Sequence, residues 1–427
     1  MLHGASRSGS VAMPAAGRGP GNPARRGFVL VTMLSCLVVL IAFLGLALDT
    51  GYLELVKTRM QTAADAAALG GAQEIRMNGA DNVLAAARAD AALNGFTDGQ
   101  HGVTVTVHNP PSGGYYTANS TGVEVVVAQQ VSAIFMGVVG AAPVSLQARA
   151  VAHLGSGTSC LHLLDPSASG AFSASGNATV QIACGVIVES SSGTAFNASG
   201  NAVVTATTIE VNGGKSISQN ATVTPTPVTR APQQGDPLAY VPAPTVGACN
   251  YTNTNISGAQ TVTLPPGVYC GGIRVSGSAR VTFSPAGTIV LNGGGLSISG
   301  NSTVTGANVT IYNTSGGGYS HGAISITGNS DVTFSAPTTG PLAGILIFQD
   351  RSMSDPATLS GNPNITLNGA LYFPSAAIAY SGNTNGADTY SIIVAKTATF
   401  TGNCKMNNDY SSLPGGSPIR GSAVLSE

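Results

Sequence analysis

Charged side chains are scarce in this sequence, and tryptophan is absent. Only 8% of the 427 residues are Asp, Glu, Lys or Arg, and the net charge is −1, whereas about 25% charged residues is usual for globular proteins. The low charge excludes a broad basic surface for nucleic acid. An apolar content of 43% excludes a disordered polyelectrolyte. The 56 glycines, together with many Ser, Thr, Asn and Val residues, favour a neutral, mainly β protein.

Motifs of common catalytic and metal sites are also absent from the sequence. It contains no HExxH, P-loop or CxxC pattern, and no GxSxG pattern between a strand and a helix; these are the signatures of several nucleophilic, metal and phosphate sites. The densest acidic group of the C-terminal part contains Asp350 and Asp355. Two carboxylates at that spacing could flank a sugar or bind Ca²⁺, although a polar loop is the simpler interpretation. We therefore predict no enzyme, no cofactor and no catalytic or metal-binding residue.

Five of the six cysteines follow residue 155. The pairs closest in sequence are Cys160 with Cys184 and Cys249 with Cys270, and each would close a loop worth about 3 kcal/mol if oxidised. Such disulfides would place this part of the chain in an oxidising compartment. Buried free thiols are the alternative to these disulfides. Cys404 is left without a cysteine to pair with.

A long uncharged apolar run lies near the N-terminus. Residues Phe28 to Leu48 contain no ionisable side chain except Cys36, and as a helix they would span about 31 Å, the thickness of a bilayer core. Residues 1–27 contain four arginines and no acid, so the positive-inside rule predicts a cytoplasmic N-terminus. A cleaved signal peptide and a buried core helix are the alternatives to this single-pass anchor.

The helical pattern continues beyond the apolar run. Residues 52–69 are good helix formers, and Gly70-Gly71 is the expected end. Gln61 and Asp65 lie four apart on one helix face. The small side chains around Ala64 would let another helix approach closely, so we expect Ala64→Leu to disrupt association with a partner helix. The alternative is that alanine is simply a good helix former.

These features occur in a characteristic order. Arg26-Gly27 precedes the apolar run, Asp49 and Gly51 follow it, and the string R-x-Q-x-A-A-D-A-A-A-L starts at Arg59 and includes Gln61, Ala63, Ala64 and Asp65. The arrangement resembles the N-terminal segment of TadG-like Flp (tight-adherence) pilus-assembly proteins over roughly residues 25–72. The resemblance implies a single-pass inner-membrane protein of a bacterial, type IV-related pilus system. Its partners would be the lipid bilayer and other pilus-assembly or pilin-like membrane proteins.

The Gly27-Phe28 junction is also similar to a prepilin-peptidase cleavage site. Type IV pilins usually carry a Glu five residues into the mature helix, and this chain has Thr32 there. We expect retention of the full-length chain, with cleavage after Gly27 as the alternative.

The next hundred residues predict a small α+β, pilin-like module. A second helical stretch over 72–93 has Gly79 as its expected break, strands are predicted at 103–107, 123–127 and 144–152, and a short helix is predicted at 133–139.

The C-terminal part repeats a Ser/Thr-Gly-Asn unit followed by β-branched residues. Clear copies begin at 175, 199, 299, 327 and 360, and looser copies at 218, 276, 381 and 401. A period near 20–25 residues predicts a mainly-β parallel β-helix (solenoid), in which Gly and Asn turn the corners and Asn side chains stack in ladders. An antiparallel sandwich is the alternative fold.

The sequence therefore predicts a multidomain protein. Its expected parts are a cytoplasmic N-terminus (1–27), a transmembrane helix (28–48), the α+β module (49–154), a first solenoid part (155–223), a proline-rich linker (224–246) and a second solenoid part (247–427). We expect a membrane-anchored structural or assembly component of a Tad/Flp-type pilus, with the bulk of the chain periplasmic. An anchored carbohydrate-binding or carbohydrate-active β-helix, with a surface glycan as partner, and a surface adhesin remain open as alternatives.

Overall fold

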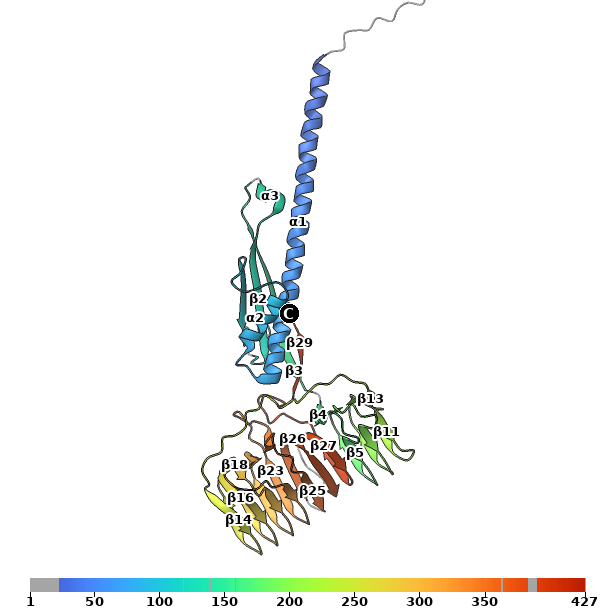
Figure 1. Cartoon of the computed structure of the whole chain (residues 1–427), viewed down its shortest axis with the longest axis vertical. Helices are drawn as coiled ribbons and strands as arrows, with labels where there is room; N and C mark the ends of the chain where they lie inside the picture. Colours follow the sequence, from blue (N-terminus) through green and yellow to red (C-terminus); the bar gives the residue numbers. More distant parts are fainter. Residues whose placement is uncertain are drawn as a thin grey trace, which may run out of the picture.

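The computed structural model describes residues 23–426 except residues 118, 139, 158, 362–363 and 383–389. Most of the predicted cytoplasmic segment and the repeat asparagines Asn362 and Asn383 lie outside the described residues. Figure 1 shows three parts: a long helix, a small module packed around its lower half, and a wide stack of short strands.

The long helix α1 runs from Pro23 to Asn78, about 84 Å at 1.5 Å per residue. Every residue from Phe28 to Leu48 is exposed except Gly45, which is buried. The helix is long and apolar enough to cross a membrane. The predicted end at Gly70-Gly71 is wrong, because α1 continues through both glycines. It ends before Gly79, which has φ +93°, a backbone conformation that glycine adopts without steric cost.

The module combines two helices with an antiparallel sheet. Helix α2 (Val83–Leu93) follows α1, and the sheet has the order β1-β2-β3-β29. Its strands are β1 (Val103–His108), β2 (Gly122–Val131), β3 (Val144–Ser156) and β29 (Arg420–Leu425). A short helix, α3 (Ile134–Val138), lies between β2 and β3. The α+β prediction is confirmed, but the second solenoid part does not extend to residue 427, because β29 pairs with β3.

The remaining strands form a stack of parallel pairs, as the solenoid prediction required, and the antiparallel sandwich is excluded for this region. In the first part they are β4 (Ser159–Leu163), β5 (Phe172–Ala174), β6 (Thr179–Ile182), β7 (Gly185–Val188), β8 (Phe196–Ala198), β9 (Val203–Thr205), β10 (Ile209–Val211), β11 (Lys215–Ile217), β12 (Thr222–Thr224) and β13 (Val228–Thr229).

In the second part the strands are β14 (Tyr251–Ile256), β15 (Thr261–Leu264), β16 (Gly267–Val275), β17 (Arg280–Phe283), β18 (Gly287–Asn292), β19 (Leu296–Ile298), β20 (Thr303–Gly306), β21 (Val309–Thr314), β22 (Ile324–Ile326), β23 (Asp331–Ser335), β24 (Ile345–Gln349), β25 (Ala357–Gly361), β26 (Asn364–Gly382), β27 (Ser391–Phe400) and β28 (Asn403–Met406).

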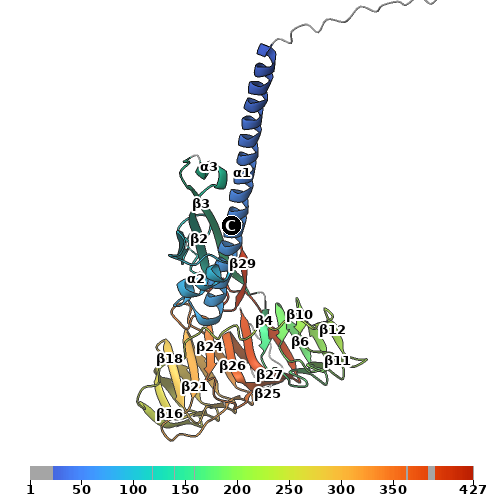
Figure 2. The same ribbon diagram turned by 45° about the horizontal axis from the view of Figure 1, so that its top comes forward.

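The chain enters this stack in the middle. Strand β4 pairs with β7 on one side and with β27 on the other. The first part therefore builds outward from β4 to β13, and the chain then crosses to the opposite end. There β14 starts the second part, which returns to β27 beside β4 (Figure 2). Two separate stretches of sequence thus form one continuous stack.

The segment that crosses between the two ends is held on the stack by polar contacts. The Arg351 guanidinium donates to the carbonyl oxygens of Leu238, Ala239 and Val241 at 2.9–3.2 Å. The Tyr372 hydroxyl donates to Asp236 at 2.6 Å. The predicted linker (224–246) therefore begins too early, because strands β12 and β13 extend to residue 229. The rest, residues 230–246, is a strap docked on the solenoid.

The interior of the stack is apolar, with Phe172 and Phe196 stacked at 4.3 Å between ring centroids. Disulfides join Cys160 to Cys184 and Cys249 to Cys270. Cys404 is buried.

Repeated glycines form the corners of the solenoid. Gly277, Gly300 and Gly328 all have φ between +74° and +80°, and each lies directly against the glycine of the preceding turn. Next to them, the backbone N–H of Asn301 donates to the Gly277 carbonyl at 2.7 Å. Among the described residues, an Asn–Asn side-chain bond joins Asn201 to Asn177 at 3.1 Å.

Two matched substitutions separate backbone strain from stacking at these corners. A Cβ at Gly300 would lie 2.6 Å from the Gly277 carbonyl oxygen, whereas a Cβ at Gly258, with φ +70°, meets nothing within 4 Å. We expect Gly258→Ala to cost about 1 kcal/mol from the left-handed backbone alone, and Gly300→Ala at least about 1 kcal/mol more from overpacking. Denaturant unfolding measures both. Equal losses would show that the corners do not pack as closely as described.

Candidate functional site

The alanine face of α1 is covered by this chain's own module. Ala63 and Ala64 are fully buried, and they belong to a core cluster with Ala87 and Ala91 of α2 and with three valines of β2. The interpretation of this face as a surface for a partner helix is therefore corrected. Ala64→Leu would overpack the module itself and would not report on a partner.

The two glycines inside α1 permit the same close packing. A Cβ at Gly70 would overlap the Asp90 carboxylate, and one at Gly71 would lie 2.9 Å from a methyl group of Val123. Glycine at these positions lets α2 and the sheet approach the α1 backbone. The packing outweighs the low intrinsic helix propensity of glycine, which explains why the helix does not end there.

The other residues of the sequence motif have different roles. The Gln61 side-chain amide donates to Asp65 at 2.7 Å and to the Arg149 carbonyl oxygen at 3.0 Å, so it links α1 to β3. Arg59 and Gly51 are exposed, and no described contact brings them to the other motif residues.

Asp49 forms a latch between α1 and α3. Its Oδ1 accepts the backbone N–H groups of Ile134 and Phe135, each at 2.8 Å, and its Oδ2 accepts that of Met136 at 2.7 Å. These are unpaired donors of the first turn of α3, so Asp49 caps a helix that begins 85 residues away. Hydrogen bonding from Phe135, followed by Met136 and Ile134, lowers the pKa of Asp49 against the opposing effect of burial.

Gly45 completes the latch one helical turn before Asp49. A Cβ at this position would lie 2.5 Å from the Phe135 ring, so the ring rests directly on the α1 backbone. The aspartate and the glycine together fix α3 against the last turn of the apolar run.

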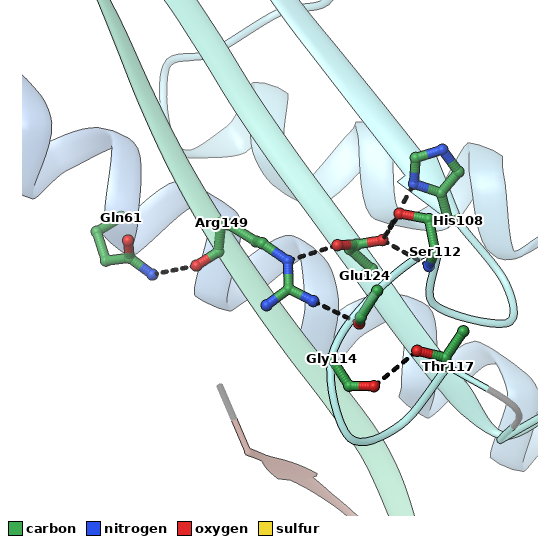
Figure 3. Close-up of polar contacts among 8 residues, drawn as sticks. Gln61, His108, Ser112, Gly114, Thr117, Glu124 and Arg149 are labelled. Carbon is green, nitrogen blue, oxygen red and sulfur yellow. Dashed lines mark hydrogen bonds and ion pairs between the residues drawn. The ribbon is translucent and has the colours of Figure 1, made fainter.

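An ion pair between a half-buried arginine and a buried glutamate lies on one face of the module sheet (Figure 3). The Arg149 guanidinium pairs with the Glu124 carboxylate, which also accepts the Ser112 backbone N–H at 2.8 Å and lies 3.3 Å from His108. A second Arg149 nitrogen donates to the Gly113 carbonyl at 2.8 Å. Burial alone would raise the pKa of Glu124, but the bonds from Ser112 and Arg149 lower it to about 2.

This pair was not predicted from the sequence, although a signal was present. Glu124 and Arg149 are single charges within otherwise uncharged strands. The antiparallel register places Arg149 opposite Val126, two residues from Glu124 on the same face. Opposite charges in such diagonal positions attract.

The module and the solenoid meet around the end of α1. The Arg76 guanidinium donates to the Gln234 carbonyl of the strap at 2.9 Å. Arg420 donates to the Ile75 carbonyl, and its guanidinium lies 3.3 Å from the centroid of the Tyr240 ring. Nearby His162 is buried, and burial lowers its pKa to about 3. These contacts join all three parts of the chain at one place.

The two acids of the carbohydrate alternative contact this chain's own side chains. Asp350 accepts the Tyr312 hydroxyl at 2.8 Å and the Ser352 backbone N–H at 2.9 Å. Burial acts to raise the pKa of Asp350, but the hydrogen bonds from Ser352, Tyr312 and Thr314 together lower it below its ordinary value. The Asp355 carboxylate lies 3.4 Å from His321. In the part of the chain that the structure describes, no three His, Cys, Asp or Glu side chains form a group that could hold a metal ion.

Comparison with known families places the similarity in the N-terminal region. Residues 27–74 match the TadE/G-like Flp pilus-assembly family, and residues 63–152 match the Tad-like Flp pilus-assembly family. The two overlapping matches cover α1 and the module up to β3, and not the solenoid. Comparisons with curated proteins and with solved structures gave no match.

The Glu124 ion pair predicts an acid-dependent stability of the module. The pKa of Glu124 is about 2 in the folded protein, against an ordinary value of 4.5. The ionised carboxylate therefore stabilises the fold above about pH 4.5, and this stabilisation is lost as the pH falls towards 2. We expect Glu124→Gln to unfold at lower denaturant concentration at pH 7 and to lose less stability on acidification than the native chain. Glu54→Gln, at an exposed position of α1, is the control. Parallel pH profiles for the native chain and Glu124→Gln would contradict the role of this carboxylate.

Proposed function

We propose that this protein is a membrane-anchored, non-enzymatic component that takes part in assembling a Tad/Flp-type pilus. The family matches over residues 27–152 support a role in pilus assembly. The single structural observation behind the anchored form is α1. Its side chains are exposed from Phe28 to Leu48, whereas one face of the helix, from Met60 to Ile75, is buried in the module.

The proposed topology follows from the distribution of charge and apolar surface. Residues 28–48 would span the inner membrane, because an exposed apolar surface of that length matches lipid and not water. The arginines before the run favour a cytoplasmic N-terminus, so the module and the solenoid would lie in the periplasm. The two disulfides of the solenoid support an oxidising compartment.

We propose that the protein acts by holding its solenoid in a fixed position relative to the membrane. The module is built on α1, and the solenoid is joined to the module by β29, by the bond from Arg76 to Gln234 and by the contact of Arg420 with Tyr240. The anchor would therefore hold a neutral β-rod at a defined distance from the membrane. Other membrane proteins of the pilus system would bind the exposed part of α1 or the rod, since the alanine face is already occupied.

The first test removes the anchor. We expect that deletion of the protein from its native host abolishes surface pili, and that the intact chain restores them. Val38→Asp combined with Leu40→Asp places two charges in the middle of the apolar run, where each costs about 3 kcal/mol for membrane insertion, and should fail to restore pili. Leu93→Asp, at an exposed apolar position of α2, is the matched control and should restore them.

Fractionation then distinguishes an assembly component from a filament subunit. An immunoblot against the solenoid compares mechanically sheared surface material with washed membranes. Full-length protein retained in the membranes supports the proposal. Protein in sheared filaments with Phe28 at its N-terminus, or pili unaffected by the deletion, would contradict it.

A further inference from the structure

The tip of the module sheet carries an exposed apolar helix at the level where the apolar run of α1 ends. We propose that α3 is inserted into the membrane interface, so that the protein contacts the lipid surface at a second point beside its anchor. This inference rests on the proposed anchoring of α1 in the bilayer and extends it to the module.

The position of α3 is fixed by its contacts with α1. Phe135 lies on Gly45, three residues or about 4.5 Å inside the end of the apolar run at Leu48. One turn later in α1, Asp49 accepts hydrogen bonds from the first turn of α3. Both views show α3 beside α1, at the end of the module farthest from the solenoid (Figures 1 and 2).

The surface of α3 is apolar and is not covered by this chain. None of its residues is buried, and the side chains of Ile134, Met136 and Val138 are 60%, 43% and 86% exposed. Val144, at the start of β3, is 40% exposed. No charged residue occurs between Glu124 and Arg149. A cluster of this kind marks an interaction site or a membrane contact.

Continuity with the apolar run identifies lipid as the occupant. The exposed face of α3 adjoins the exposed apolar surface of α1, so one apolar medium would cover both. Backbone N–H groups in an apolar environment need partners, and Asp49 supplies them to Ile134, Phe135 and Met136. In return, these donors solvate an acidic side chain close to the hydrocarbon, where an unpaired charge is costly.

The absence of tryptophan from the chain allows a direct test by single-Trp fluorescence. Val138→Trp is placed in the full-length protein, which is reconstituted in vesicles of phosphatidylcholine and phosphatidylglycerol with or without bromine on the upper acyl chains. Interfacial helices lie about 5–10 Å deep, so we expect bromine to reduce the emission about twofold. Leu93→Trp, at a similarly exposed position of 84%, should not be quenched.

A third variant separates failure of this inference from failure of the anchor. Leu40→Trp, in the middle of the apolar run, should be quenched by bromine on the lower acyl chains. Quenching of Leu40→Trp without quenching of Val138→Trp would overturn the insertion of α3 and leave the anchor intact. Shielding of Val138→Trp only after other pilus membrane proteins are added would likewise overturn it, in favour of a protein partner. No quenching of either variant would contradict the anchor itself.

Discussion

The structure depends on one helix that must suit two environments. The first half of α1 presents apolar side chains to its surroundings, and the second half presents alanines and glycines to a packed module. A helix that changes environment without changing direction transmits the orientation of its first half to everything built on its second half. The small side chains are therefore needed for a geometric reason: they let α2 and the sheet lie directly on the α1 backbone.

Near the boundary between these halves, the polar groups are matched within the chain. Asp49 lies directly after the apolar run, and the donors of α3 satisfy both of its oxygens. Farther from the boundary, Arg149 and Glu124 pair inside the sheet. At the far end, Arg76 and Arg420 bind backbone carbonyl oxygens and connect the module to the solenoid. A buried charge is compatible with the folded state when it has a partner, whereas a buried charge without a partner is strongly destabilising.

Local signals in the sequence were enough to predict the types of element but not their long-range pairing. Gly79 ends α1 as expected, because nothing packs against it and its positive φ suits glycine. Gly70 and Gly71 also predicted a helix end, but α1 continues through both of them. Asp90 and Val123, from elements that follow later in the chain, pack against these two glycines. The repeat predicted the glycine corners, since each copy restates one backbone requirement.

The order of the strands in the stack could not be read from any single copy of the repeat. Whether β27 pairs with β4 depends on which ends of the two solenoid parts meet, and the strap that crosses between them resembles an ordinary proline-rich linker in sequence. The same is true of β29, whose six residues pair with β3 more than 260 positions earlier. Asp49 was singled out by a family resemblance, but its partners lie 85 to 87 residues away, and only the structure identifies them.

The central claim is that α1 is one uninterrupted helix from the membrane to the solenoid, so that it sets the position of the rod. Hydrogen–deuterium exchange of the full-length protein in lipid nanodiscs tests this claim most directly. The account predicts slow exchange throughout α1, including Gly51 between the apolar run and the module and Gly70-Gly71 within it. Exchange at the rate of an unstructured peptide at either place would show a joint in the helix and would contradict the claim.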